Sequence, residues 1–135
     1  MCSSDLERRW GRIINMLNTL AKTPARGTAP TSVTRAAGMA LTKVLAGEGA
    51  PHNILVNGFN IGLIKSDQIR RAWERSDRSK DFDEFVAEAG AKNVPLGRYG
   101  EAEECANLAV LLCSDDCGFV SGTSINIDGN MSPAM

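Results

Sequence analysis

Two runs of apolar residues stand out along the chain, at Ile13 to Leu17 and at Asn53 to Val56. Both are nearly continuous rather than alternating, which is typical of parallel strands that are covered on both faces. We therefore expect two central strands of a parallel sheet at these positions. A third strand is expected at Ser124 to Ile127, near the end of the chain.

Between the first two strands the pattern changes to a helical period. Apolar residues recur three and four positions apart, which predicts a helix from about Thr31 to Glu48 with one apolar face. That face would consist of Val33, Ala36, Ala37, Ala40, Leu41, Val44 and Leu45. Pro30 suits the first turn of this helix, and Pro51 follows its end.

A second helix is expected from about Glu101 to Ser114, because three glutamates fall in its first turn, where the helix dipole favours carboxylates. Its apolar positions are Ala102, Cys105, Ala106, Ala109, Leu112 and Cys113. The order strand, helix, strand, helix, strand predicts an α/β fold, in which a three-stranded parallel unit has right-handed connections.

The segment 67–92 interrupts this alternation and carries Trp73, Phe82 and Phe85 among many charged residues. We expect one or two mobile helices there. Composition alone fits a solvated pair of charged helices equally well.

Composition and charge narrow the class of protein. Fifteen basic and sixteen acidic residues leave a formal charge of -1, which gives no electrostatic reason to expect nucleic acid or an anionic membrane as a partner. No apolar run approaches the roughly 20 residues that span a bilayer, and Met1 to Leu20 lacks the pattern of a signal peptide. We therefore expect a cytoplasmic protein.

The four cysteines, Cys2, Cys105, Cys113 and Cys117, are expected to be free thiols. Two of them fall on the second predicted helix, and no Cys or His pair complements Cys113 and Cys117. Thiols in a reducing compartment fit this distribution better than disulfides, and no metal site is expected.

The chemistry of the chain is concentrated after the first strand. Asn18 ends that strand, Thr31 stands thirteen positions later, and Arg35 follows four positions after Thr31. This layout resembles the short-chain dehydrogenase/reductase family, in which a strand ends in a serine and the next helix carries Tyr-x-x-x-Lys. The three catalytic positions are all substituted here.

Four further motifs extend the resemblance from about Gly11 to Asn130. They are Ala50 to Asn57, similar to APHxIxVN; Ile61 to Ser66, similar to PGxxxT with proline and threonine replaced; Pro95 to Glu104, similar to PLGRxGxxEE; and Gly122 to Gly129, similar to GxxIxVDGG.

The resemblance implies the C-terminal part of a Rossmann-type doubly wound parallel sheet, with three parallel strands, two main helices and a helical lid at 67–92 over the substrate. It implies a full-length parent that binds NAD or NADP, acts on a small carbonyl or alcohol substrate and forms a homo-oligomer. The positions that would contact the cofactor are Arg35, Ile61, Gly62, Ile64 and Ser66.

The family's glycine-rich turn, where backbone N–H groups hold the cofactor pyrophosphate, has no counterpart in this sequence. Residues 7–135 therefore correspond to the second half of a family member, and this chain alone is expected to bind no cofactor. Residues 1–6 match nothing in the family and read as the translated end of a common sequencing adapter with GTG as start codon, an artefact; an ordinary polar leader is the alternative.

The substitutions change what the site can do. In the resembled mechanism the tyrosine exchanges the proton, and a phenol with a pKa of about 10 can be tuned towards neutrality by a nearby cation. The hydroxyl of Thr31 titrates far higher, and the permanently charged fork of Arg35 does not reproduce a compact ammonium. Asn18 could still polarise a carbonyl. Binding geometry is thus expected to persist while proton transfer is lost.

No other residue replaces the tyrosine convincingly. Tyr99 occupies an aromatic packing position of the GRxG turn, and His52 precedes a strand. Ser32 and Thr34 could act only through water, and Lys43 points away from the expected site. Two readings follow: a fragment of an NAD(P)-dependent oxidoreductase that is inactive as this chain, or a non-catalytic, ligand-binding or partner-subunit relative of such enzymes.

Overall fold

The computed structural model describes residues 3–135 and contains one sheet of three parallel strands in the order β1-β2-β3. The strands are β1 (Gly11–Asn18), β2 (Ile54–Ile61) and β3 (Ser124–Ile127). β1 pairs with β2 over its whole length, whereas β3 joins only the second half of β2. The expected α/β fold with a parallel sheet is confirmed. Met1 and Cys2 of the expected leader lie outside the described residues, and α1 (Ser3–Arg8) begins within it.

β2 is longer than the apolar run that predicts it, because it continues through polar residues to Ile61. Asn57 and Asn60 are almost fully buried, but the side-chain amide of Asn57 donates to the carbonyl of Val120 over 2.9 Å. The amide of Asn60 donates to the side-chain oxygen of Asn126 over 3.1 Å. Oδ1 of Asn60 is buried without a hydrogen-bond partner within residues 3–135. The amide donors of both asparagines are hydrogen-bonded, which lowers the cost of burying them within the strand.

β1 lies at the edge of the sheet, and the expectation that it is a central strand is wrong for this chain. Among residues 3–135 it pairs with β2 alone. The side of β1 that faces away from β2 is therefore an open strand edge, and Met16 on this strand is 56% exposed. Open edges of this kind favour association with other chains.

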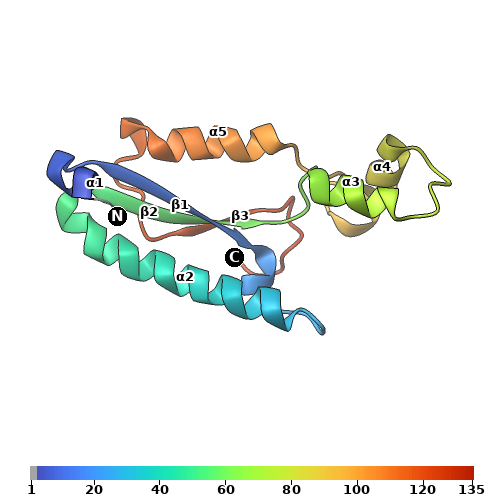
Figure 1. Cartoon of the computed structure of the whole chain (residues 1–135), viewed down its shortest axis with the longest axis horizontal. Helices are drawn as coiled ribbons and strands as arrows, with labels where there is room; N and C mark the ends of the chain where they lie inside the picture. The colour runs from blue at the N-terminus through green and yellow to red at the C-terminus, as the bar shows by residue number, and fades with distance from the viewer. Residues whose placement is uncertain (1–2) are drawn as a thin grey trace.

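Two long helices, α2 (Ala29–Gly49) and α5 (Ala102–Cys113), cover opposite faces of the sheet, as Figure 1 shows. Both lie within two residues of their predicted bounds. α2 is linked to β2 by the short η2 (Ala50–His52) and by Asn53, which has a left-handed φ of 56°. This arrangement of a helix on each face is that of a doubly wound sheet.

The face that α2 turns to the sheet differs from the predicted one. Ser32, Thr42, Ala46 and Gly49 are buried there, while most of the predicted apolar face is exposed. The exposed members include Val33, Leu41 and Val44, at 67%, 51% and 56%. Only Leu45 of the predicted set packs against the core cluster of Ala46, Ile54 and Val56.

Small residues explain this orientation. A Cβ atom built on Gly38 would lie 2.6 Å from a methyl carbon of Leu17, and one on Gly49 would lie 2.7 Å from the carbonyl oxygen of Ile54. The helix therefore approaches the sheet closely along its small and hydroxyl-bearing side, and bulkier side chains on that side would not fit.

The segment 67–92 lies in a separate lobe at one end of the sheet (Figure 1). It contains α3 (Asp67–Glu74) and α4 (Phe82–Asn93), so the expected helix pair is present. Its core is a cluster of Val86, Val94 and Tyr99, surrounded by half-buried apolar residues that include Phe82 and Phe85. The rings of Trp73 and Phe82 meet edge to face, with centroids 5.7 Å apart.

Two short helices, η1 (Thr19–Ala21) and η3 (Asp115–Cys117), follow β1 and α5 respectively. None of the helices within residues 3–135 is long and apolar enough to cross a bilayer.

Candidate functional site

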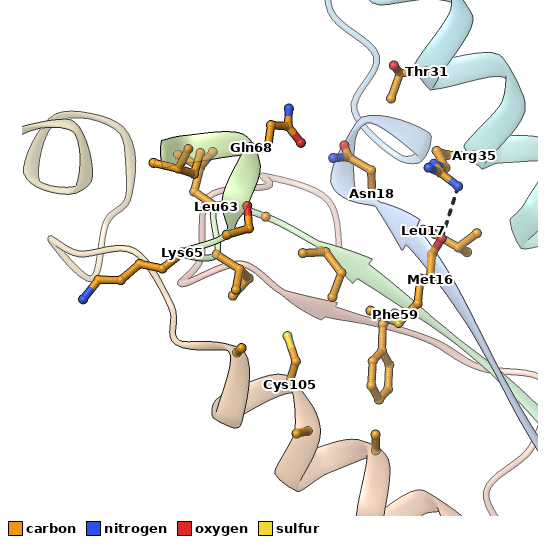
Figure 2. A pocket seen from close by; sticks show the side chains of 18 residues that line it. Met16, Leu17, Asn18, Thr31, Arg35, Phe59, Leu63, Lys65, Gln68 and Cys105 are labelled. Carbon is orange, nitrogen blue, oxygen red and sulfur yellow. Dashed lines mark hydrogen bonds between the residues drawn. The ribbon is translucent and has the colours of Figure 1, made fainter. Parts of the chain in front are cut away.

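A cavity of about 760 Å³ opens where β1 and β2 end, between the sheet, the start of α3 and α5 (Figure 2). Its apolar lining comes from the strands, the loop after β2 and α5. These residues are Met16, Leu17, Phe59, Ile61, Leu63, Ile64, Ile69, Ala102, Cys105, Ala106 and Ala109. Ligand sites in doubly wound folds lie at this carboxyl edge of the sheet.

The three positions of the expected catalytic residues, Asn18, Thr31 and Arg35, all line this cavity. Asn18 is the last residue of β1, and the other two lie one turn apart on α2. The structure thus brings together residues that sequence spacing selects. What each of them does there stays a prediction.

Asn18 is held by the helix that follows it. Its side-chain oxygen Oδ1 accepts a hydrogen bond from the backbone N–H of Leu20 over 2.8 Å and caps η1. A residue that follows a strand and precedes a helix commonly plays this capping role. The amide nitrogen Nδ2 remains as a donor, and Figure 2 shows it turned towards the cavity.

Arg35 is anchored to the same strand. Its Nη1 donates to the backbone oxygen of Met16 over 3.3 Å, which keeps the guanidinium beside the end of β1. Thr31 stands apart from this pair in Figure 2. Thr31 is exposed, and no hydrogen bond of its hydroxyl occurs within residues 3–135.

The loop after β2 forms one wall of the cavity, and the expected cofactor positions Ile61, Gly62, Ile64 and Ser66 all line it. Gly62 lets the loop pass beside the end of β3, since a Cβ atom there would lie 2.7 Å from Cα of Asp128. Ile64 forms an isolated parallel bridge with Gly100. A glycine is therefore required at position 62, because the backbone there passes close to the backbone of Asp128.

Several lining residues were not selected by the sequence. Lys65 lies in the same loop, and its Nζ is 2.6 Å from Oε1 of Glu101. The hydrogen bond to Glu101 raises the pKa of Lys65, so this ammonium stays charged. Cys105 and Gln68 also line the cavity, and burial raises the pKa of the Cys105 thiol. The helical spacing on α5 places Cys105 on the side that faces the sheet, and this spacing is the sequence feature that could have predicted Cys105 as a lining residue.

The residues set aside as substitute acids lie outside the cavity lining. Tyr99 is 7% exposed in the cluster with Val86 and Val94, and burial raises its pKa, so it packs as expected. The Ser32 hydroxyl is 2.7 Å from that of Thr28, and the Thr34 hydroxyl donates to the carbonyl of Pro30. Lys43 donates to the carbonyl of Gly122, and His52 lies in η2 at the other end of α2.

Cys105, Cys113 and Cys117 are free thiols. The part of the chain from residue 3 onwards has no group of three His, Cys, Asp or Glu side chains that could hold a metal ion.

Residues 2–132 match a protein-family model described as enoyl-(acyl carrier protein) reductase. The chain is 33% identical over 126 residues to the 3-oxoacyl-(acyl-carrier-protein) reductase of Aquifex aeolicus, which covers 93% of this chain and 47% of that protein. The chain spans about half the length of the curated relatives it matches.

Solved structures agree with this match. An L-sorbose reductase from Gluconobacter frateurii, in complex with NADPH and L-sorbose, is 33% identical, with a TM-score of 0.86 over 96% of this chain and 50% of that one. A short chain oxidoreductase from Pseudomonas aeruginosa PAO1 that contains an atypical catalytic center is 34% identical, with a TM-score of 0.83 over 92% of this chain and 48% of that one.

Proposed function

Because this chain belongs to the short-chain dehydrogenase/reductase family, we propose that it is the substrate-side half, residues 7–135, of an NAD(P)-dependent oxidoreductase acting on a carbonyl or alcohol group. We further propose that the 135-residue chain is inactive by itself. The observation that carries this proposal is that Asn18, Thr31 and Arg35 line the same cavity as the loop after β2.

NAD or NADP supplies the hydride when bound in such enzymes. On this chain Arg35 and the loop from Ile61 to Ser66 would hold its nicotinamide and ribose side. The donors available there fit that part of the cofactor, since a guanidinium and the Ser66 hydroxyl can hydrogen-bond to ribose oxygens. The relative from Gluconobacter frateurii was solved with NADPH, which supports a nicotinamide cofactor for the parent.

Asn18 would orient the substrate, because its free amide N–H groups can donate to a carbonyl oxygen. Proton transfer is the weak step. A reduced carbonyl needs a proton, and neither a permanently charged guanidinium nor an aliphatic hydroxyl supplies one readily at neutral pH. The substitutions therefore support a site that binds and orients but transfers protons slowly.

A non-catalytic role is the second candidate. In it the cavity holds a ligand, or the chain serves as a partner subunit, without turnover. The observation that favours it is that the side chains of Asn18 and Arg35 are both hydrogen-bonded to the backbone. Asn18 accepts from the N–H of Leu20, and Arg35 donates to the oxygen of Met16. Fixed groups of this kind suit binding. The Pseudomonas aeruginosa relative is described as an oxidoreductase with an atypical catalytic center, which supports the catalytic alternative.

The lid, 67–92, would cover the substrate, since Gln68 and Ile69 of α3 already line the cavity. We also propose a homo-oligomeric parent, which the outward apolar side of α2 supports. A cytoplasmic location, without nucleic acid or membrane partners, remains the proposal that charge and composition favour.

The test is a chimera in which the N-terminal half of the Aquifex aeolicus reductase precedes residues 7–135. We expect it to bind NADPH, seen by quenching of protein fluorescence, and to reduce activated ketones about 10²–10⁴-fold more slowly than the intact relative. Thr31→Tyr together with Arg35→Lys should raise turnover, and Thr31→Tyr alone should raise it less. Brisk turnover that survives Thr31→Ala would show that proton transfer is intact and the proposal wrong.

A further inference from the structure

The charged residues that line the cavity are both cations. They are Arg35 and Lys65, and none of the eighteen lining residues is an aspartate or glutamate. Lys65 is paired with Glu101, which lies outside the lining. Arg35 forms no ion pair within residues 3–135. One unneutralised cation therefore faces a cavity without a carboxylate of its own.

Asn18 strengthens this asymmetry. An asparagine side chain normally offers one acceptor and two donors. Here Oδ1 already accepts the N–H of Leu20 at 2.8 Å, which orients the side chain, whereas no hydrogen bond of its Nδ2 donors occurs within residues 3–135. The guanidinium of Arg35 is hydrogen-bonded to the backbone oxygen of Met16, two residues before Asn18, so both side chains lie near the end of β1 (Figure 2).

An apolar surface begins directly beside these donors. Met16 is 56% exposed and lines the cavity, and Phe59, Cys105 and Ala109 continue the lining towards α5. Arg35 itself is exposed, so it stands at the water-filled mouth. The cavity thus has a cationic, donor-rich end in contact with water and an apolar interior.

We propose that this cavity binds an amphipathic carboxylate, with the carboxylate held by Arg35 and Asn18 and the apolar chain lying along Met16, Phe59 and α5. The planar guanidinium fork matches the two oxygens of a carboxylate, and charge-assisted hydrogen bonds are stronger than those to a neutral carbonyl. This inference rests on the site of the proposed function, and it needs no hydride or proton transfer.

Calorimetry of the 135-residue chain with octanoate and with 1-octanol tests the proposal. These probes share the apolar chain and differ in the head group. We expect octanoate to bind at least about tenfold more tightly than 1-octanol at neutral pH, since one hydrogen-bonded charge is worth about that factor. Similar affinity for both probes, or no octanoate binding, would overturn the proposal.

Two variants locate the carboxylate. Asn18→Asp keeps an acceptor for the Leu20 N–H but replaces the free donor by a negative charge, and Arg35→Met removes the cation at similar length. Each should weaken octanoate binding about tenfold or more and change 1-octanol binding by less than about threefold. Retained 1-octanol binding also shows that the cavity is folded.

Lys92→Met, in the last turn of α4 and outside the cavity lining, changes the net charge by the same amount as Arg35→Met. It should leave octanoate binding unchanged. An equal loss in Lys92→Met and Arg35→Met would mean that overall charge, and not this site, attracts the probe, which contradicts the proposal. Ketone reduction by the chimera is measured without octanoate, so failure of the carboxylate site and failure of the oxidoreductase proposal are seen separately.

Discussion

The side-chain amide of Asn15 on β1 donates to the hydroxyl of Thr42 on α2 over 2.9 Å, and the Thr42 hydroxyl donates in turn to the carbonyl of Gly38 over 2.8 Å. Thr42 is 1% exposed, so this polar link is buried between helix and sheet. It fixes which side of α2 faces the sheet and hence where Thr31 and Arg35 stand relative to Asn18.

Removing this link should destabilise the chain. In Thr42→Val the shape is kept, but the half-buried amide of Asn15 loses its acceptor, which costs about 1 kcal/mol. Urea denaturation followed by circular dichroism measures the change in the free energy of unfolding. Thr34→Val, on an exposed turn of the same helix, is the control and should change little. Equal midpoints for both variants would contradict the structural role of Thr42.

The ion pair of Glu104 with Arg98 should make stability depend on pH in the acid range. The side-chain hydrogen bond from Arg98, followed by the backbone N–H of Glu101, lowers the pKa of Glu104 from 4.5 to about 2. Because the pKa is depressed in the folded state, the stabilisation is present above pH 4.5 and is lost as the pH falls towards 2.

Glu104→Gln should therefore lower the urea midpoint at neutral pH and have a much smaller effect near pH 2, where the folded-state carboxyl becomes protonated. Glu103→Gln, in the same turn of α5, is the matched control, because no ion pair of Glu103 occurs within residues 3–135. An effect of Glu104→Gln that persists unchanged at pH 2 would rule out this linkage.

The exposed side of α2 and the open edge of β1 should make the isolated chain self-associate. Val44→Glu places a charge on the exposed apolar side of α2 and should shift the mass measured by light scattering towards the monomer. Val110→Glu makes the same change at an exposed valine of α5, which is 71% exposed, and should shift it less. A monodisperse monomer with a sharp cooperative melt would show that neither surface drives association.

The isolated chain should show no measurable affinity for NAD(H) or NADP(H) at millimolar concentration. The proposed site holds only the nicotinamide side of a cofactor, and the pyrophosphate normally supplies much of the binding through backbone N–H groups at a helix N-terminus. Calorimetry with the four cofactor forms is the measurement. A micromolar dissociation constant for any of them would mean that the chain holds a cofactor in a way that its sequence does not indicate.

Sequence alone determined the alternation of strands and helices, because each element carries its own periodicity. The apolar runs at Ile13 and Asn53 marked β1 and β2, the helical spacing located α2 and α5, and β3 occurs at its expected residues. The resemblance to the short-chain dehydrogenase/reductase motif selected Asn18, Thr31 and Arg35, and all three line one cavity.

Tertiary structure decided which faces are used. The apolar side of α2 was expected to face the sheet, yet Thr42 and Gly38 face it, because Thr42 accepts a hydrogen bond from Asn15 of β1 and Gly38 leaves room for Leu17 of β1. The donor character of Asn18 likewise follows from the N–H of Leu20. The periodicity of a helix predicts that it has an apolar and a polar side. The contacts that decide which side faces the sheet join residues far apart in the chain, and these contacts form only when the elements pack.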